Sequence, residues 1–207
     1  MVRDTNSEPG GVKPPGANTM HNLTILIPAA GSSSRMQGRD KLMELVAGQP
    51  LLRRQALIAL PLAPVIVTLR PDDPRAAALH GLTLAVMEVP DAATGLAASL
   101  RAAAKTTTTA LMILPADMPD LTEVDLASVI AAFLQAPDTI HRGASASGTP
   151  GHPVILSARY LPDIAQLSGD EGARSLVARH GAILVPLPGT HATTDLDTPE
   201  DWAKWRS

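Results

Sequence analysis

The chain has 207 residues, enough for one domain with a full hydrophobic core and too few for two comfortable ones. Its formal net charge of −3 argues against a general nucleic-acid surface, because such surfaces carry a basic excess. The lack of cysteine excludes disulfides, thiolate metal sites and a cysteine nucleophile, and it fits a reducing, cytoplasmic location. Any metal must therefore bind to oxygen or imidazole ligands.

The start of the chain differs in composition from the rest. Residues 1–22 are rich in Pro, Gly and Asn and lack the apolar stretch of a secretory signal, so we expect a disordered tail there. No apolar run reaches the ~20 residues needed to span a bilayer. We therefore expect a single domain over residues 23–207, with neither a membrane nor a nucleic-acid partner.

Beyond the tail, short apolar runs alternate with helical patterns. The runs predict β-strands at 23–27, 64–69, 82–89, 110–115 and 182–187. Helical patterns fall at about 50–60, 73–79, 94–105, 122–135, 171–179 and 199–206. Most of the strands are apolar on both faces, as parallel strands covered by helices are. The alternation predicts an α/β fold with a parallel-rich sheet and helices on both sides.

Capping signals mark three helix starts, each with a hydroxyl residue three positions before a carboxylate. The pairs are Thr122 with Asp125, Ser168 with Glu171, and Thr198 with Asp201. The stretch 141–153 is rich in Gly, Ser and Pro, and it predicts a loop of the kind that often borders a site.

The stretch PAAGSSSRMQGRDK, residues 28–41, follows the first predicted strand. Ligands of open α/β sheets bind at the carboxyl ends of strands, where small residues let backbone N–H groups approach phosphate oxygens. The stretch supplies small residues, hydroxyl donors and two cations, namely Ala29, Ala30, Gly31, Ser32, Ser33, Ser34, Arg35 and Lys41. It is neither a P-loop nor a dinucleotide fingerprint. On spacing alone, an ordinary surface turn with solvated cations explains it equally well.

The same stretch resembles the signature loop of the nucleotidyltransferases with a Rossmann-like fold, loosely A-A/G-G-x-x-x-R-M-x-x-x-K. Within them, the chain is most similar to the molybdenum cofactor cytidylyltransferases and their MobA-like relatives. Further segments resemble the family in the same order, at 95–105, 114–121, 148–156, 167–182 and 194–202. The resemblance covers residues 23–204. It implies a Rossmann-like three-layer α/β/α sandwich with a mostly parallel mixed sheet, of the nucleotide-diphospho-sugar transferase type.

The resemblance also implies roles for individual residues. The expected nucleotide-binding residues are Ala29, Ala30, Gly31, Ser33, Arg35, Lys41, Gly95 and Ser99. Arg35, Lys41 and Asp117 would be catalytic, the two cations taking up charge on the α-phosphoryl group and on pyrophosphate. Asp117 and Asp197 would bind Mg²⁺, which prefers carboxylates together with substrate phosphates. His152 would face the acceptor substrate.

Several of these positions have plainer explanations. Asp197 precedes a helix cap, and Asp195 is a weaker metal candidate for which a solvated or structural role is the simpler reading. Gly95 and Ser99 also suit the start of a core helix, and a lone loop histidine such as His152 is often solvated. Two departures from the family pattern stand out. Gln37 lengthens the first loop by one residue, and Pro150 occupies a position where many relatives carry Arg.

The implied reaction is Mg²⁺-dependent transfer of CMP from CTP to the terminal phosphate of molybdopterin or molybdenum cofactor, with release of pyrophosphate. An ionised phosphate nucleophile needs no general base, which agrees with the absence of a catalytic triad. Ala30 favours CTP, since guanylyl-transferring relatives tend to have Gly there; GTP as donor and a sugar phosphate as acceptor remain alternatives. A molybdoenzyme or its chaperone is a possible partner.

Two rival functions belong to other classes. One is an NAD(P)H-dependent oxidoreductase related to nicotine blue oxidoreductase, a protein that resembles the same family. The other is a noncatalytic accessory protein that binds nucleotide and guides cofactor insertion. The missing dinucleotide fingerprint and the presence of both Asp117 and Asp197 weigh against the reductase.

Overall fold

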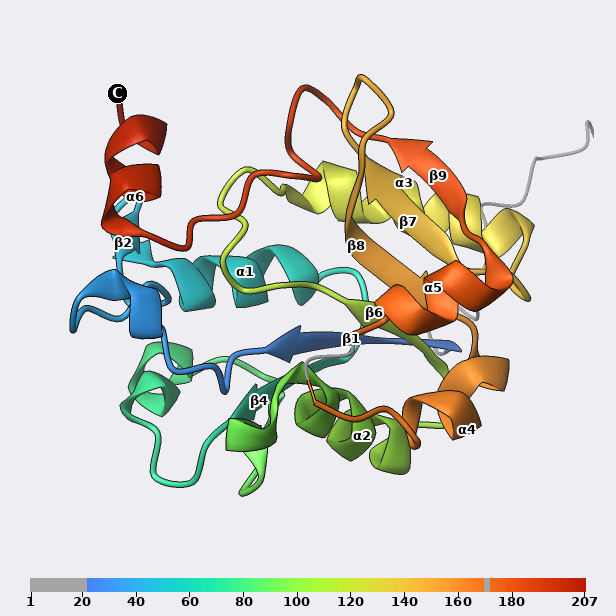
Figure 1. The fold of residues 1–207 in the computed structure, drawn as a ribbon, viewed down its shortest axis with the longest axis horizontal. Helices are drawn as coiled ribbons and strands as arrows, with labels where there is room; N and C mark the ends of the chain where they lie inside the picture. Colours follow the sequence, from blue (N-terminus) through green and yellow to red (C-terminus); the bar gives the residue numbers. More distant parts are fainter. Residues whose placement is uncertain (1–21, 170–171) are drawn as a thin grey trace, which may run out of the picture.

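The computed structural model of the protein describes residues 22–169 and 172–207 (Figure 1). The tail expected over residues 1–22 therefore lies outside the described residues, apart from Asn22. The main sheet has the strand order β5-β4-β1-β6-β8-β7-β9. Its strands are β1 (Leu23–Pro28), β4 (Val65–Leu69), β5 (Ala85–Glu88), β6 (Ala110–Ile113), β7 (His141–Ala144), β8 (Pro150–Leu156) and β9 (Ile183–Pro186). A separate small hairpin consists of β2 (Leu45–Val46) and β3 (Gln49–Pro50).

The main sheet is mixed and mostly parallel, which confirms the expected fold class. Strands β5, β4, β1 and β6 run parallel, and β8 pairs antiparallel with β6 and with β7. Strand β9 pairs parallel with β7 at the far edge. The chain runs from β1 to β4 on one side of β1 and returns to β6 on the other, so the order of strands reverses at β1 and β6.

Helices cover both faces of this sheet (Figure 1). The helices are α1 (Leu51–Ala59), α2 (Leu96–Thr106), α3 (Glu123–Gln135), α4 (Leu161–Ile164), α5 (Arg174–His180) and α6 (Pro199–Trp205). Short 3₁₀ helices are η2 (Ser34–Met36), η3 (Pro74–Leu79), η4 (Ala92–Thr94) and η5 (Ala158–Tyr160). Because side chains alternate along a strand, Ile25 of β1 packs in the core with α1 and α3, and Leu26 in the core with α2, α4 and α5.

The loop predicted for residues 141–153 is present only at 145–149. The rest of the prediction is wrong, because β7 and β8 form an antiparallel pair there. The glycines allow close backbone packing. A Cβ at Gly143 would lie 2.4 Å from the carbonyl oxygen of His152, and one at Gly151 would lie 1.7 Å from that of Ala192. Glycine in a strand often marks such an approach, so composition alone suggests a loop here.

Most other predicted elements are present with small changes. Strand β5 is shorter than the predicted 82–89 and, like β9, is largely exposed because it lies at a sheet edge. The helix predicted at 73–79 is the 3₁₀ helix η3, and α5 begins at Arg174, later than predicted. Capping boxes at Thr122 and Thr198 are confirmed, whereas the pair of Ser168 with Glu171 includes a residue outside the described ranges.

None of the helices in the described ranges is long and apolar enough to cross a membrane.

A small third core joins the C-terminal helix to the first loop. Trp202 of α6 packs with buried side chains from the loop, the β2–β3 hairpin, α1 and the segment before α6, namely Met36, Val46, Leu51 and Leu196. Trp205 adds a hydrogen bond from its indole N–H to Asp120, at 2.8 Å. Since Met36 follows Arg35 and Leu196 precedes Asp197, this core places both charged residues.

We expect Trp202→Ala to lower the free energy of unfolding by ~3–5 kcal/mol, because Trp202 is 1% exposed and its loss leaves a cavity in the small core. Urea unfolding followed by circular dichroism measures the change. Val124→Ala is the matched control, since Val124 is 73% exposed and should change stability little. Equal stabilities for the two variants would contradict the packing described here.

Candidate active site

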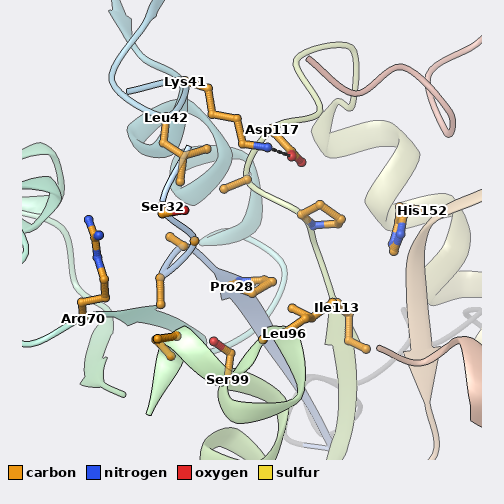
Figure 2. A pocket seen from close by; sticks show the side chains of 18 residues that line it. Pro28, Ser32, Lys41, Leu42, Arg70, Leu96, Ser99, Ile113, Asp117 and His152 are labelled. Carbon is orange, nitrogen blue, oxygen red and sulfur yellow. Dashed lines mark hydrogen bonds and ion pairs between the residues drawn. The ribbon is translucent and has the colours of Figure 1, made fainter. Parts of the chain in front are cut away.

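A cavity of about 570 Å³ lies where β1 and β6 end side by side (Figure 2). Residues that follow β1 form one wall, residues that follow β6 form another, and the start of α2 closes the cavity below. This is the point where strand order reverses, the usual ligand site of open α/β sheets. The volume lies within the range of pockets that bind small molecules and cofactors.

Many of the residues proposed from the sequence line this cavity. They are Ala29, Ala30, Gly31, Lys41, Gly95, Ser99, Asp117 and His152. Figure 2 shows Lys41 and Asp117 together at one end of the cavity and Ser99 at the other, with Arg70 and His152 on opposite sides. Ser33, Arg35 and Asp197 stand outside the cavity lining.

The first loop leaves β1 and turns tightly before Lys41. Ser33 has a φ of 50°, and its hydroxyl donates to Asp40 at 3.2 Å, away from the cavity. Gln37 and Gly38 also have positive φ values, 53° and 86°. The additional residue Gln37 is thus accommodated in a left-handed turn at the end of η2, beyond the part of the loop that lines the cavity.

Lys41 joins the loop to two carboxylates from distant parts of the chain. Its Nζ donates to Oδ2 of Asp117 at 2.5 Å and to Oδ1 of Asp197 at 2.6 Å. Arg35 pairs with the other oxygen of Asp197 at 2.8 Å, although its side chain is 69% exposed. The structure therefore brings together Arg35, Lys41, Asp117 and Asp197.

The backbone of the segment that carries Asp197 is hydrogen-bonded to the residues after β6 and to β8. The N–H of Leu196 donates to the carbonyl of Asp117 at 3.1 Å, and the N–H of His152 donates to the carbonyl of Ala192 at 2.7 Å. The capping box of Thr198 leaves the carboxylate of Asp197 directed to Lys41. Asp197 can therefore precede the helix cap and contact Lys41 at the same time.

The two carboxylates suit a divalent cation, because Lys41 already shows that one oxygen from each converges on a single cationic centre. Burial by itself would lower the pKa of Lys41, but the charge of Asp117 and the hydrogen bonds to both carboxylates outweigh burial and raise that pKa. Among the described residues, no group of three or more His, Cys, Asp and Glu side chains could hold a metal. A metal held here would therefore need phosphate or water oxygens as further ligands, which is usual for Mg²⁺.

Two further titratable residues lie close by. Asp195 has a raised pKa because burial disfavours its charge and because Asp117 and Asp197 repel it. Burial and the charge of Arg142 lower the pKa of His152 to about 4, while Asp117 opposes that shift. The His152 imidazole is thus neutral near pH 7, and its Nδ1 has no hydrogen-bond partner among the described residues.

Sequence reasoning missed several residues of this site. Of the loop serines expected to offer hydroxyls, Ser32 lines the cavity and Ser33 does not. Arg70, directly after β4, also lines the cavity and was not predicted. Arg70 was detectable, because it is a cation at the carboxyl end of a predicted strand. Arg75, which contacts the first loop from beneath, has no comparable signal in the sequence, since it belongs to a short 3₁₀ helix.

The fold and the arrangement of charges define an α/β nucleotidyltransferase. A sequence model of the MobA-like NTP transferase domain matches residues 25–183, and the chain belongs to that family. The match confirms the resemblance indicated by the first loop and the later segments. No curated protein matches the chain significantly.

Solved structures agree with this assignment. A homologue of Mycobacterium tuberculosis Rv0371c, from Mycobacterium sp. strain JC1, is 28% identical with a TM-score of 0.74 over 89% of this chain and 94% of that one. Rv0371c from M. tuberculosis H37Rv in complex with manganese is 24% identical, with a TM-score of 0.70 over 88% and 97%. Molybdopterin-guanine dinucleotide biosynthesis protein A from Archaeoglobus fulgidus is 14% identical, with a TM-score of 0.65 over 87% and 95%. At such identities the last two show the fold alone.

We expect the partly buried imidazole of His152 to make stability depend on pH. Its pKa is ~6.5 in an unfolded chain and about 4 in the folded one. The folded state therefore needs the neutral ring, so its contribution is complete above pH ~6.5 and is lost as the pH falls toward 4. Across that window wild type should lose roughly 3 kcal/mol more than His152→Gln.

Urea unfolding at a series of pH values measures this difference. His80→Gln is the control, because His80 is exposed and its removal should leave the wild-type profile unchanged. Parallel profiles for wild type and His152→Gln would show that His152 is not held neutral.

Proposed function

We propose that this nucleotidyltransferase moves a CMP group from CTP to the terminal phosphate of a molybdopterin-type acceptor, with Mg²⁺ as cofactor and release of pyrophosphate. The observation that carries the proposal is the convergence of Lys41, Asp117 and Asp197 at one end of a nucleotide-sized cavity. The cation would contact phosphates there, and the carboxylates would hold a metal. Family membership supports the same reaction class.

The cavity suggests how the substrates lie. The phosphates of the nucleotide would lie at the Lys41 end, against the small residues Ala30 and Gly31. The base and ribose would extend toward Gly95 and Ser99. Gly95 has no side chain and so allows a close approach at the start of α2, and its φ of 114° favours glycine there. The acceptor would enter on the side of His152.

The proposed choice of CTP as donor rests on one residue of the first loop, Ala30. Ala30 is 6% exposed and lines the cavity, so its methyl group narrows the space that Gly would leave there. Relatives that transfer cytidylyl groups tend to have Ala at this position, and relatives that transfer guanylyl groups tend to have Gly. The resemblance to those relatives at position 30 therefore favours CTP over GTP.

The residues of the chain act by alignment and charge. Lys41 and Arg35 neutralise the charge that develops on the α-phosphoryl group and on the leaving pyrophosphate. A divalent cation held by Asp117 and Asp197 would neutralise phosphate oxygens in the same place. The acceptor phosphate is ionised, so no residue has to remove a proton from it. His152, neutral and with no partner for its Nδ1 in the part of the chain that the structure describes, would orient the acceptor by a hydrogen bond.

The deciding experiment measures pyrophosphate release with each of four NTPs and Mg²⁺, with and without molybdenum-loaded molybdopterin. The proposal expects release from CTP only, and only with that acceptor. Selective use of GTP, or of a sugar phosphate as acceptor, would overturn the cytidylyl assignment while keeping nucleotidyl transfer. No release under any condition would overturn the transfer reaction itself.

We expect Lys41→Met and Asp117→Asn each to lower the rate of pyrophosphate release by roughly a hundredfold or more, because one preorganised charge partner is lost from the transition state. Arg39→Met is the matched control. Arg39 is a cation of the same loop, but it pairs with Glu44 and its side chain is 50% exposed. Rates near wild type for either site variant would exclude these residues from the reaction.

The contact of Lys41 with both carboxylates leads to a separate expectation for metal binding. Without nucleotide, a metal must compete with the ammonium of Lys41 for the same two residues. Lys41→Met removes this competitor, so Mn²⁺ affinity without nucleotide should rise by about tenfold or more, since a nearby unit charge is worth ~1–4 kcal/mol. The spin-resonance signal of free Mn²⁺ measures it.

A double variant controls this measurement. Lys41→Met combined with Asp117→Asn removes one of the proposed ligands, and it should lose the gain in Mn²⁺ affinity. Unchanged or weaker Mn²⁺ binding by Lys41→Met alone would show that the two carboxylates are not the metal ligands.

A further inference from the structure

Arg75 is a buried arginine that the proposed reaction does not use. It lies in η3, after β4, and its side chain is 1% exposed. Its guanidinium makes five hydrogen bonds, and all of them go to the segment 29–40 of the first loop. An arginine from another part of the chain therefore lies directly beneath the loop that is proposed to hold the phosphates.

The contacts of Arg75 reach both ends of the loop. Its Nη1 donates to the carbonyl oxygens of Ala29 and Gly31, at 2.5 and 2.6 Å. Its Nε and Nη2 donate to the two oxygens of Asp40, at 2.6 and 2.9 Å, and Nη2 also donates to the hydroxyl of Ser33 at 3.1 Å. The beginning and the end of the loop thus share one partner.

Burying a guanidinium costs several kcal/mol unless it is paired and hydrogen-bonded. The carboxylate of Asp40 and the two carbonyls satisfy Arg75 here. Burial by itself would raise the pKa of Asp40, but the hydrogen bond and charge of Arg75 outweigh burial and lower it. A planar guanidinium fork serves a carboxylate and two carbonyls at once, which the single ammonium of lysine cannot do.

The carbonyl contacts also set the direction of two N–H groups. In a planar trans peptide, the carbonyl of one residue and the N–H of the next point in opposite directions. Because the carbonyls of Ala29 and Gly31 point to Arg75, the N–H groups of Ala30 and Ser32 point away from it. Both residues line the cavity, and no backbone carbonyl in the described ranges accepts from either N–H.

The contact with Asp40 acts on the other end of the loop. Asp40 directly precedes Lys41, and its Oδ1 also accepts from the N–H of Leu42 at 3.0 Å. The carboxylate held by Arg75 therefore fixes the backbone on both sides of Lys41. Arg75 itself lies outside the cavity lining, so any effect on a ligand must pass through the loop.

We propose that Arg75 is a positioning residue for the phosphates of the nucleotide. It directs the N–H groups of Ala30 and Ser32 toward the phosphate oxygens and fixes the backbone from which Lys41 extends. The inference rests on the proposed function, because it takes the Lys41 end of the cavity as the place of the phosphates.

The test uses inorganic triphosphate as the probe, since it reports on the phosphate end without the base or the acceptor. Isothermal titration of the full chain measures its affinity for wild type, Arg75→Met and Arg75→Lys. Both variants should bind triphosphate at least tenfold more weakly, because neither side chain can hold two carbonyls and a carboxylate together. Should Arg75→Met not fold by circular dichroism, Arg75→Lys and Asp40→Asn carry the same test.

Arg53→Met is the matched control for a purely structural effect. The Nη1 of Arg53 donates to the carbonyls of Ala78 and His80, at 2.9 and 3.0 Å, so it secures η3 without touching the loop. Urea unfolding of every variant shows how much stability each has lost. Arg53→Met should keep wild-type triphosphate affinity.

Three results would contradict the proposed role of Arg75. Wild-type affinity in Arg75→Met and Arg75→Lys would overturn the role of Arg75 and leave the proposed function standing. Equal losses of affinity in Arg75→Met and Arg53→Met would also overturn it, because general destabilisation would then explain both. Failure of wild type to bind triphosphate would refute the proposed function, and the inference with it.

Discussion

The contact of Lys41 with Asp117 and Asp197 is the interaction on which the site depends. It joins the loop after β1, the residue beyond β6 and the segment before α6. Asp117 lies 76 positions and Asp197 156 positions from Lys41 along the chain. One ammonium and two carboxylates held this closely are stable only when opposite charges pair and hydrogen-bond with one another. The arrangement therefore requires the strand order that puts β1 beside β6 and a C-terminal segment that returns to the same edge.

The surrounding structure holds these three segments from different directions. Arg75 supports the loop from beneath, and the core around Trp202 holds Met36 and Leu196, the neighbours of Arg35 and Asp197. His191 adds a hydrogen bond to Asp125 at the start of α3, at 2.9 Å, within the stretch that leads to Asp197. The charged residues are thus placed by a buried frame. About half of the residues that line the cavity beside them are Ala, Gly or Ser, which leaves room for a ligand.

Much of the fold was predictable because its signals are local. The apolar runs of β1 and β6, the capping boxes of Thr122 and Thr198, and the small residues after β1 all follow from patterns within a few positions. The prediction failed at β7 and β8, where Gly143 and Gly151 resemble loop residues. Their role is to let backbones touch, as the short distances to His152 and Ala192 show. The sequence pattern alone does not reveal whether a glycine belongs to a loop or lies in a strand where two backbones touch.

The sequence by itself determined which chemical groups stand at the ends of the strands: a loop of small and cationic residues after β1 and an aspartate after β6. These are local properties, since a strand end and the residues that follow it are neighbours in the chain. Only the tertiary structure decided that Asp197 meets Lys41, that Ser32 and not Ser33 lines the cavity, and that Arg75 lies under the loop. Such contacts depend on strand order and on side-chain packing over long separations, and no local pattern encodes either.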